Sequence, residues 1–411
     1  MPKVLHILSQ RPGRTGSGVA LQAMLKYASE SGWEQEVICG TPCNDPRPEF
    51  ELPEECVHPL VFERDISYQI PGMSDVMPYP STRFSSMTPA QLTEYRAAWS
   101  SHLSGAIDDF RPDLIHSHHL WIVSSLLKDV APEIPVVTQC HATGLRQMRL
   151  CPHLADAVRV GCSRNDHFLA LHTGDARAIA TELGVPDERV SVVGAGYRKE
   201  IFHPGSTSML SPRVAYVGKY SSAKGLPWLL DAFERLAAER PGLELHVAGS
   251  GSGEEADDLR ARMQAMAPAV TLHGALSQEQ LGDMLRCCRA FVLPSLYEGV
   301  PLVVVEALAC GCRSVATDLP GVRDELAPHL GDALICVRPP RLDGVDTPDA
   351  RDLPRFVDAL YGALSRALDE PLDSSPDRAR LDRFTWSAVF RRVESIWRRL
   401  AGGQEPRGPA I

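Results

Sequence analysis

The chain has 411 residues, more than one hydrophobic core usually organises, so two domains are the first expectation. Apolar residues make up 44% of it and charged residues 23%, which is ordinary for a globular protein. The formal net charge of -10 argues against a nucleic-acid-binding protein, because such a protein needs a broad basic surface.

The N-terminus and the cysteines favour a cytoplasmic protein with reduced thiols. Met1–Gln10 lacks the long apolar centre of a signal peptide, and the best apolar stretch, Pro301–Cys312, is too short to span a bilayer. The eleven cysteines are irregularly spaced, and Cys310 and Cys312 have no second pair at zinc-finger spacing. We therefore expect neither a disulfide framework nor a structural metal site.

Residues 1–205 alternate short apolar runs with helical patterns, as in a doubly wound α/β domain. Residues 41–90 interrupt this rhythm with nine prolines and no sustained pattern, so we expect a long irregular insertion there. The expected strands are residues 3–8, 36–39, 114–116, 135–138, 158–162 and 190–193. The expected helices are residues 19–29, 92–110 and 175–183, and a glycine-containing loop at residues 11–18 precedes the first of them.

We place the domain linker at residues 203–212, which contain two prolines and no periodicity. The strand–helix rhythm then restarts and predicts a second domain at residues 206–385. Its expected strands are residues 213–217, 243–248, 270–272, 290–293 and 313–316, and its expected helices are residues 227–239, 254–266, 278–286 and 301–310. Residues 386–411 contain a last amphipathic helix, which we expect to pack back on the first domain.

Residues 294–311 carry the most informative pattern. A strand ends at Leu293, the following loop carries Glu298, and a helix starts with Pro301 in its first turn, where proline is tolerated. Free backbone N–H groups at a helix start bind anions, and a carboxylate such as Glu306 accepts hydrogen bonds from ribose hydroxyls. Together these groups describe a site for a nucleotide-sugar. The alternative, a buried strand–helix pair with solvated glutamates, does not explain a glutamate among the apolar neighbours of Glu306.

Glu298 and Glu306, with seven residues between them and with the flanking Ser295, Gly299 and Gly311, resemble the paired-glutamate motif of retaining GT-B glycosyltransferases of the family-four type (glycosyl transferases group 1). The resemblance implies an α/β fold of two Rossmann-like domains facing across a cleft, the first binding the acceptor and the second the sugar nucleotide. It also implies a retaining transfer of a hexose-type sugar from a nucleoside diphosphate sugar to a small-molecule or glycan acceptor. A UDP-sugar, UDP-N-acetylglucosamine included, is the favoured donor, and no metal or other cofactor is expected.

The resemblance assigns further site residues. Lys219 and Lys224 match the pair that binds the donor diphosphate and stabilises its departure, although the first position is normally Arg. His141 matches the histidine that touches the donor sugar, and these three residues with Glu298 form the expected catalytic set. The expected donor-binding residues are Gly16, Ser17, Gly18, Gly218, Gly249, Gly299, Val300, Pro301, Leu302 and Glu306. Arg198 stands where the family more often has Asp.

Acceptor specificity is expected in the first domain, because the donor determinants lie mainly in the second. The irregular segment 66–86 and two arginines beyond His141 are the candidates. The expected acceptor-binding residues are Tyr68, Tyr79, Arg83, Arg146 and Arg149. The alternative is that the segment only wraps the first domain and that the arginines form surface ion pairs.

Several alternatives stay open. A GT-B epimerase, a sugar phosphorylase or a non-catalytic nucleotide-sugar-binding scaffold would share the same motifs. His116, His118 and His119 suggest a metal site by type, but the resemblance assigns them to packing at a strand end. The arginines of the last helix leave contact with a membrane surface open, although a helix docked on the protein is favoured, and homo-oligomerisation also stays open.

Overall fold

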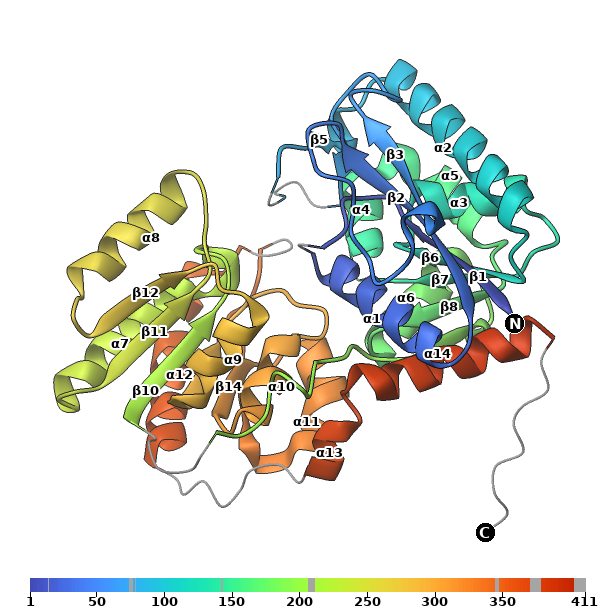
Figure 1. Ribbon diagram of the computed structural model, residues 1–411. Helices are drawn as coiled ribbons and strands as arrows, with labels where there is room; N and C mark the ends of the chain where they lie inside the picture. The colour runs from blue at the N-terminus through green and yellow to red at the C-terminus, as the bar shows by residue number, and fades with distance from the viewer. Residues whose placement is uncertain are drawn as a thin grey trace, which may run out of the picture. The chain divides into compact units, whose positions relative to one another are not determined.

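The computed structural model describes residues 1–13, 15–73, 77, 79–141, 143–205, 211–343, 347–369 and 378–402. The chain divides into two compact units, of which unit 1 comprises residues 1–194 and 386–411 and unit 2 comprises residues 195–385 (Figure 1). The predicted linker at residues 203–212 lies within unit 2, and its residues 206–210 are outside the described ranges. The chain therefore passes between the units twice, after Gly194 and before Trp386.

Unit 1 contains a seven-stranded parallel sheet with the order β3-β2-β1-β6-β7-β8-β9. The strands are β1 (Lys3–Leu8), β2 (Glu34–Pro42), β3 (Val57–Phe62), β6 (Leu114–His118), β7 (Val136–Gln139), β8 (His167–Ala170) and β9 (Val190–Val192). The helices are α1 (Gly16–Glu30), α2 (Pro89–Phe110), α3 (Ile122–Val130), α4 (Thr143–Leu150), α5 (Pro152–Cys162), α6 (Thr173–Leu183) and α14 (Trp386–Leu400). The short strands β4 (Pro71–Gly72) and β5 (Thr82–Arg83) pair separately.

Unit 2 contains a six-stranded parallel sheet with the order β12-β11-β10-β13-β14-β15. The strands are β10 (Ser211–Val217), β11 (Glu244–Ala248), β12 (Val270–Gly274), β13 (Cys288–Leu293), β14 (Arg313–Thr317) and β15 (Leu334–Val337). The helices are α7 (Leu226–Glu239), α8 (Glu254–Ala265), α9 (Gln278–Arg286), α10 (Leu302–Ala309), α11 (Ala327–Leu330), α12 (Leu353–Asp369) and α13 (Arg378–Asp382). Both sheets have the doubly wound order of a Rossmann-like domain, so the α/β fold class with two such domains is confirmed.

Two predicted features of unit 1 differ from the structure. Residues 158–162, expected as a strand, form the end of α5, because Leu154, Ala155, Val158 and Cys162 follow helical spacing and are all buried. Residues 41–90 are not wholly irregular, because β3 lies within them at the edge of the sheet. Proline interrupts β3, and an edge strand tolerates a proline, which has no N–H to donate.

The start of α1 also lies earlier than predicted. The sequence suggests a loop through Gly18, whereas α1 begins at Gly16. The hydroxyl of Thr15 accepts a hydrogen bond from the backbone N–H of Gly18 at 3.2 Å, which caps the first turn. The predicted donor-binding residues Gly16, Ser17 and Gly18 are therefore the first turn of a helix.

The last helix, α14, completes unit 1 by packing on α1. Trp397 is fully buried, and its ring lies 5.2 Å from that of Trp33 in an edge-on contact. The indole N–H of Trp33 donates to Glu394 at 3.1 Å, and Arg392 donates to the carbonyl of Val193 at 2.7 Å. Apolar burial and paired polar groups together hold the helix in place.

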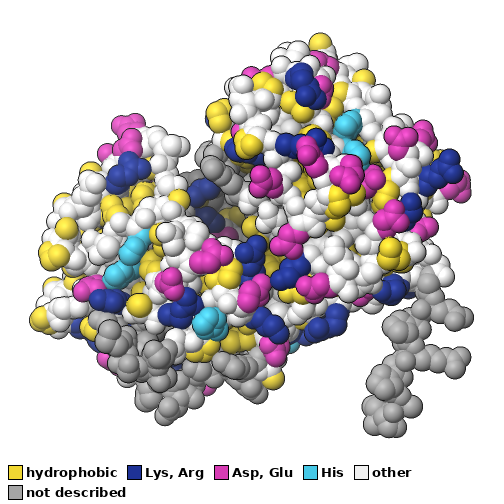
Figure 2. Space-filling view, in the orientation of Figure 1, with side chains coloured by type: hydrophobic (Ala, Val, Ile, Leu, Met, Phe, Trp, Pro, Cys, Tyr) yellow, Lys and Arg dark blue, Asp and Glu magenta, His cyan; other side chains and the backbone are white. Residues whose placement is uncertain are grey.

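Charged side chains of both signs are interspersed over the face of the two units that Figure 2 shows. Charged side chains also form ion pairs within a unit, such as Arg240 with Asp369 at 2.7 Å. Such exposed pairs contribute little to stability but avoid a large field of one sign. Within the described ranges, the chain has no helix that is both long and apolar enough to cross a membrane.

The packing of α14 predicts that Trp397→Ala destabilises unit 1. Removal of a large buried side chain costs about 3–5 kcal/mol, because the cavity closes only in part. Urea unfolding followed by intrinsic fluorescence should show the transition of unit 1 shifted by this amount. Arg391→Ala, on the exposed side of the same helix, serves as the control and should change stability by less than about 0.5 kcal/mol. An equal effect of both substitutions would contradict the role of Trp397 as the anchor.

Candidate active site

The strand order of unit 2 reverses between β10 and β13, and ligands of open parallel sheets bind at the carboxyl ends of the strands beside such a reversal. The loops that follow β10, β11 and β13 are residues 218–225, 249–253 and 294–301. These three loops contain five of the ten predicted donor-binding residues. The topology therefore brings to one edge of one sheet residues that lie up to 83 positions apart in the chain.

The three loops touch through their backbones. Gly249 has a φ of +136°, and a Cβ atom there would lie 1.9 Å from the carbonyl oxygen of Gly218. Gly225 has a φ of +70°, and a Cβ atom there would lie 2.0 Å from the carbonyl oxygen of Pro294. Only glycine fits at these two positions, so their side-chain-free backbones allow the loops to pack as one layer.

Lys224 and Glu298 form an ion pair across two of these loops. The ammonium Nζ of Lys224 lies 2.6 Å from Oε1 of Glu298, and the two side chains are only 27% and 17% exposed. This is a short charge-assisted hydrogen bond between two of the four predicted catalytic residues. The neighbouring Lys219 is positioned through its carbonyl oxygen, which accepts from the hydroxyl of the buried Tyr216 at 2.8 Å.

The start of α10 adjoins this ion pair in the sequence. Pro301 is the N-cap of α10 and provides no side-chain hydrogen bond to the helix, and the segment from Gly299 to Leu302 leads directly into it. Helix starts carry a partial positive charge and free N–H groups, so this one suits a phosphate. Ser295, in the same loop, has a buried hydroxyl with no hydrogen-bond partner among the described residues.

Glu306 is a buried carboxylate one turn into α10, and it is 7% exposed. Burial raises the pKa of Glu306 from 4.5 to about 7, and the positive charge of Arg198 partly offsets this rise. Arg198 is a neighbour of Glu306 that the sequence analysis noted only as a departure from the family pattern. The sequence shows the positive charge of Arg198. It does not show that Arg198 lies close to Glu306, which is 108 positions away.

In unit 1, the predicted donor-binding residues around α1 lie after β1, beside the reversal of strand order between β1 and β6. The side-chain amide of Gln10 donates to the hydroxyls of Ser17 at 2.6 Å and Thr15 at 3.1 Å. A Cβ atom at Gly18 would lie 2.5 Å from the backbone nitrogen of Gly13, so the loop folds tightly over the helix start. Gln10 was not predicted, and nothing in its local sequence pattern marks it.

His141 follows β7 and is held by the histidines that end β6. Its Nε2 lies 3.0 Å from Nδ1 of His118, and Nδ1 of His119 lies 3.0 Å from the hydroxyl of Thr143. Burial lowers the pKa of His141 to about 4 and those of His118 and His119 well below their ordinary value. These imidazoles are therefore neutral at physiological pH, which suits hydrogen bonding more than charge stabilisation.

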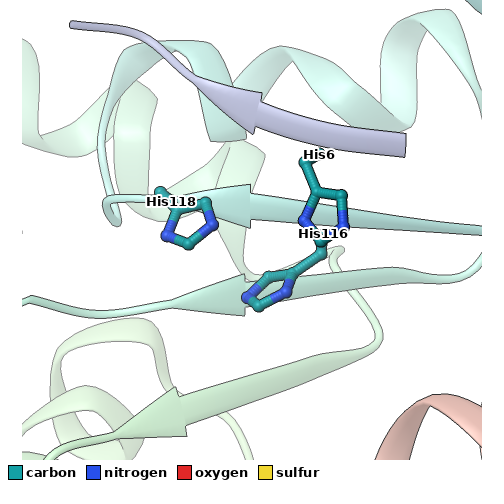
Figure 3. A group of neighbouring side chains, drawn as sticks. All are labelled: His6, His116 and His118. Atoms are coloured by element: carbon teal, nitrogen blue, oxygen red, sulfur yellow. The ribbon is translucent and has the colours of Figure 1, made fainter. Parts of the chain in front are cut away.

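The side chains of His6, His116 and His118 lie close together on neighbouring strands, with one ring nitrogen from each within 4.8 Å of the others (Figure 3). The rings of His116 and His118 are stacked at 4.7 Å with an angle of 19° between their planes. A metal ion lies in the plane of each imidazole that binds it, so two nearly parallel stacked rings do not share one ion. The arrangement fits packing of neutral imidazoles, with Trp397 5.5 Å from the ring of His6.

The predicted acceptor-binding residues lie on different elements of unit 1. Tyr68 is half-buried and donates from its hydroxyl to the carbonyl of Gln91 at 2.7 Å, and Tyr79 is 7% exposed. Arg83 ends β5 and is exposed, whereas Arg146 and Arg149 lie on α4. Within residues 66–86, Met73 and Phe84 also belong to the hydrophobic core of unit 1, so part of this segment packs into that core. Residues 74–76 and 78 of the segment are outside the described ranges.

Two family models match the chain in turn. Residues 15–196 match a glycosyl transferase 4-like domain, and residues 211–342 match glycosyl transferases group 1. The D-inositol 3-phosphate glycosyltransferase of Thermobispora bispora is 26% identical over 418 residues, covering 93% of this chain and 89% of that protein. A glycogen synthase of Mycobacterium tuberculosis is 26% identical and covers 75% of this chain and 74% of its own length.

Solved structures share the fold. Sucrose-phosphate synthase from Thermosynechococcus elongatus aligns with a TM-score of 0.71 at 16% identity, covering 98% of this chain and 100% of its own. Anabaena HepE in complex with UDP-glucose aligns with a TM-score of 0.64 at 16% identity, covering 97% and 99%. The fold is that of the GT-B glycosyltransferases. The chain belongs to the glycosyl transferases group 1, family-four type, as its glutamate motif predicts.

The pKa of Glu306 predicts how stability depends on pH. This carboxyl has a pKa of about 7 in the folded protein and 4.5 when unperturbed, so the folded state binds the proton more tightly and loses stability as the pH rises through this interval. Glu306→Gln removes the titration. Its free energy of unfolding relative to the wild type should rise by about 3 kcal/mol between pH 4.5 and pH 8.

Urea denaturation at the two pH values measures this difference. Glu188→Gln, at an exposed position of unit 1, is the control and should show a change with pH of less than about 0.5 kcal/mol. A Glu306→Gln difference that stays constant from pH 4.5 to pH 8 would show that folding does not raise the pKa of Glu306.

Proposed function

We propose that the protein is a retaining glycosyltransferase that moves a hexose-type sugar from a nucleoside diphosphate sugar to a small-molecule or glycan acceptor. The observation that carries the proposal is the contact between Lys224 and Glu298 at the switch point of unit 2, beside the start of α10. This places one positive and one negative group together where a donor sugar and its leaving diphosphate would need them.

The donor would bind in three parts. The start of α10 and the two lysines, Lys219 and Lys224, would hold the diphosphate, and Glu306 would accept from the ribose hydroxyls. Glu298 would bind sugar hydroxyls and exchange part of its contact with Lys224 for them. UDP is the favoured nucleotide, as in the complexes of Anabaena HepE with UDP and UDP-glucose, and UDP-N-acetylglucosamine is among the donors to test.

Catalysis would then be electrostatic. Charge accumulates on the diphosphate as the glycosidic bond breaks, and the lysines and the helix start stabilise it without a metal ion. The acceptor hydroxyl would attack from the side of the leaving group, and the departing phosphate oxygen would take its proton, which retains the configuration. Arg83, Arg146 and Arg149 suit an anionic acceptor, and a relative is named for D-inositol 3-phosphate.

The two glutamates should separate binding from turnover. Glu306→Ala removes the ribose acceptor and should weaken binding of the free nucleoside diphosphate, whereas Glu298→Gln should leave that binding near normal and lower kcat. Calorimetry with UDP, and kinetics with the sugar nucleotide that most raises the unfolding temperature, measure the two effects. Equal losses of UDP affinity in both variants would overturn the assigned roles, and no stabilisation by any sugar nucleotide would overturn the function.

Replacement of either lysine should slow the chemical step. Lys219→Ala and Lys224→Ala should each lower kcat by about a hundredfold or more, because one electrostatic donor to a developing charge commonly contributes that much. Lys199→Ala, which removes an exposed charge of unit 2, is the control and should stay within a few-fold of the wild type. EDTA should leave turnover unchanged. Near-normal activity of both site variants would exclude leaving-group stabilisation by these residues.

A further inference from the structure

His118 and His141 are joined by a hydrogen bond between two ring nitrogens, at the carboxyl ends of β6 and β7. Nδ1 of His118 lies 3.0 Å from Nε2 of His141, and the two rings are nearly parallel, with centroids 5.3 Å apart. A neutral imidazole has one N–H group and one lone pair, so one ring donates and the other accepts. The hydrogen bond therefore couples the tautomers of the two residues.

The remaining nitrogen of His118 decides between the two arrangements. Nε2 of His118 is buried and has no hydrogen-bond partner among the described residues. If His141 donated, His118 would have to carry its proton on Nε2 and bury an unpaired N–H group, which costs about 1–3 kcal/mol. If His118 donates from Nδ1, its Nε2 carries only a lone pair, and buried unpaired acceptors are more frequent than buried unpaired donors.

The rings of His6, His116, His118 and His141 contact one another in that order and form a row in unit 1. This row of histidines contains a second fixed tautomer. The side-chain amide nitrogen of Gln35 donates to the carbonyl of Leu25 at 3.0 Å, so its oxygen faces His6. His6 must then donate from Nε2 to that oxygen, at 3.1 Å. Neutral imidazoles with a proton assigned by a neighbour are thus a feature of this row, of which Figure 3 shows three members.

We infer that His118 is a positioning residue that holds His141 with its proton on Nδ1. Nδ1 of His141, for which no hydrogen bond to a described residue is found, is then a neutral donor available to an acceptor oxygen of a ligand. On the proposed function, which this last step requires, that oxygen belongs to a substrate of the sugar transfer. A donor at this position distinguishes His141 from Glu298, which only accepts.

The tautomer is tested without any substrate. Nitrogen-15 NMR of histidine-labelled full-length protein separates protonated from unprotonated ring nitrogens, and the His141→Gln spectrum assigns the His141 signals. In the wild type we expect the proton of His141 on Nδ1. In His118→Phe, which stacks but cannot donate, we expect a shift toward the Nε2–H form, whereas His118→Asn keeps a donor near the Nδ1 position and should preserve the Nδ1–H form. A wild-type proton on Nε2 of His141 overturns the inference, whether or not the variants fold.

Kinetics then test the consequence. His118→Phe should lower kcat/KM for the sugar nucleotide about tenfold, the effect of one hydrogen bond, while His118→Asn should recover to within about threefold of the wild type. His116→Phe, at a buried and stacked position on the same strand, is the matched control and should also stay within about threefold. Equal losses in His118→Phe and His116→Phe would show a packing role alone and overturn the positioning role. A wild type that binds no sugar nucleotide but keeps the Nδ1–H form would refute the proposed function and leave the tautomer intact.

Discussion

The candidate site of unit 2 depends on one constraint, the pairing of β10 with β13 in the sheet. Because these strands are neighbours, the loops at their carboxyl ends converge, and Lys224 and Glu298 form an ion pair although they lie 74 positions apart in the chain. Glycines bring the same loops into backbone contact, because a Cβ atom at Gly225 or Gly249 would clash with the neighbouring loop. Because these backbones pack closely, a ligand that takes over part of the contact between the two side chains would leave the loops in place.

The two units present different chemistry at equivalent places in their sheets. Unit 2 concentrates charge, with two lysines, a helix start and two glutamates, one of them with a raised pKa. Unit 1 provides neutral imidazoles and hydroxyls, because burial lowers the pKa of every histidine in its central row. The two units therefore share one kind of fold, and the residues at their strand ends determine the chemistry that each unit presents.

The fold could be predicted from the sequence to the extent that its signals are local. Strands buried on both faces are continuous apolar runs, and the motif around Glu298 and Glu306 lies within nine residues, so both were readable. The end of α5 and the strand β3 were not, because a short apolar run fits either period and Pro59 conceals an edge strand. Arg198 beside Glu306 and His118 beside His141 depend on how segments distant in the chain pack together, which local patterns do not encode.

Unit 1 is discontinuous, since α14 joins it after the whole of unit 2 has intervened. A ribosome therefore synthesises the helix that carries Trp397 after the whole of unit 2, and until then Trp33 and His6 lack their contacts with the ring of Trp397. Unit 2, which is continuous in the chain, can complete its core first. Folding during synthesis would thus run from the second unit to the first, and a chaperone that covers apolar surface would have its longest contact with the N-terminal half.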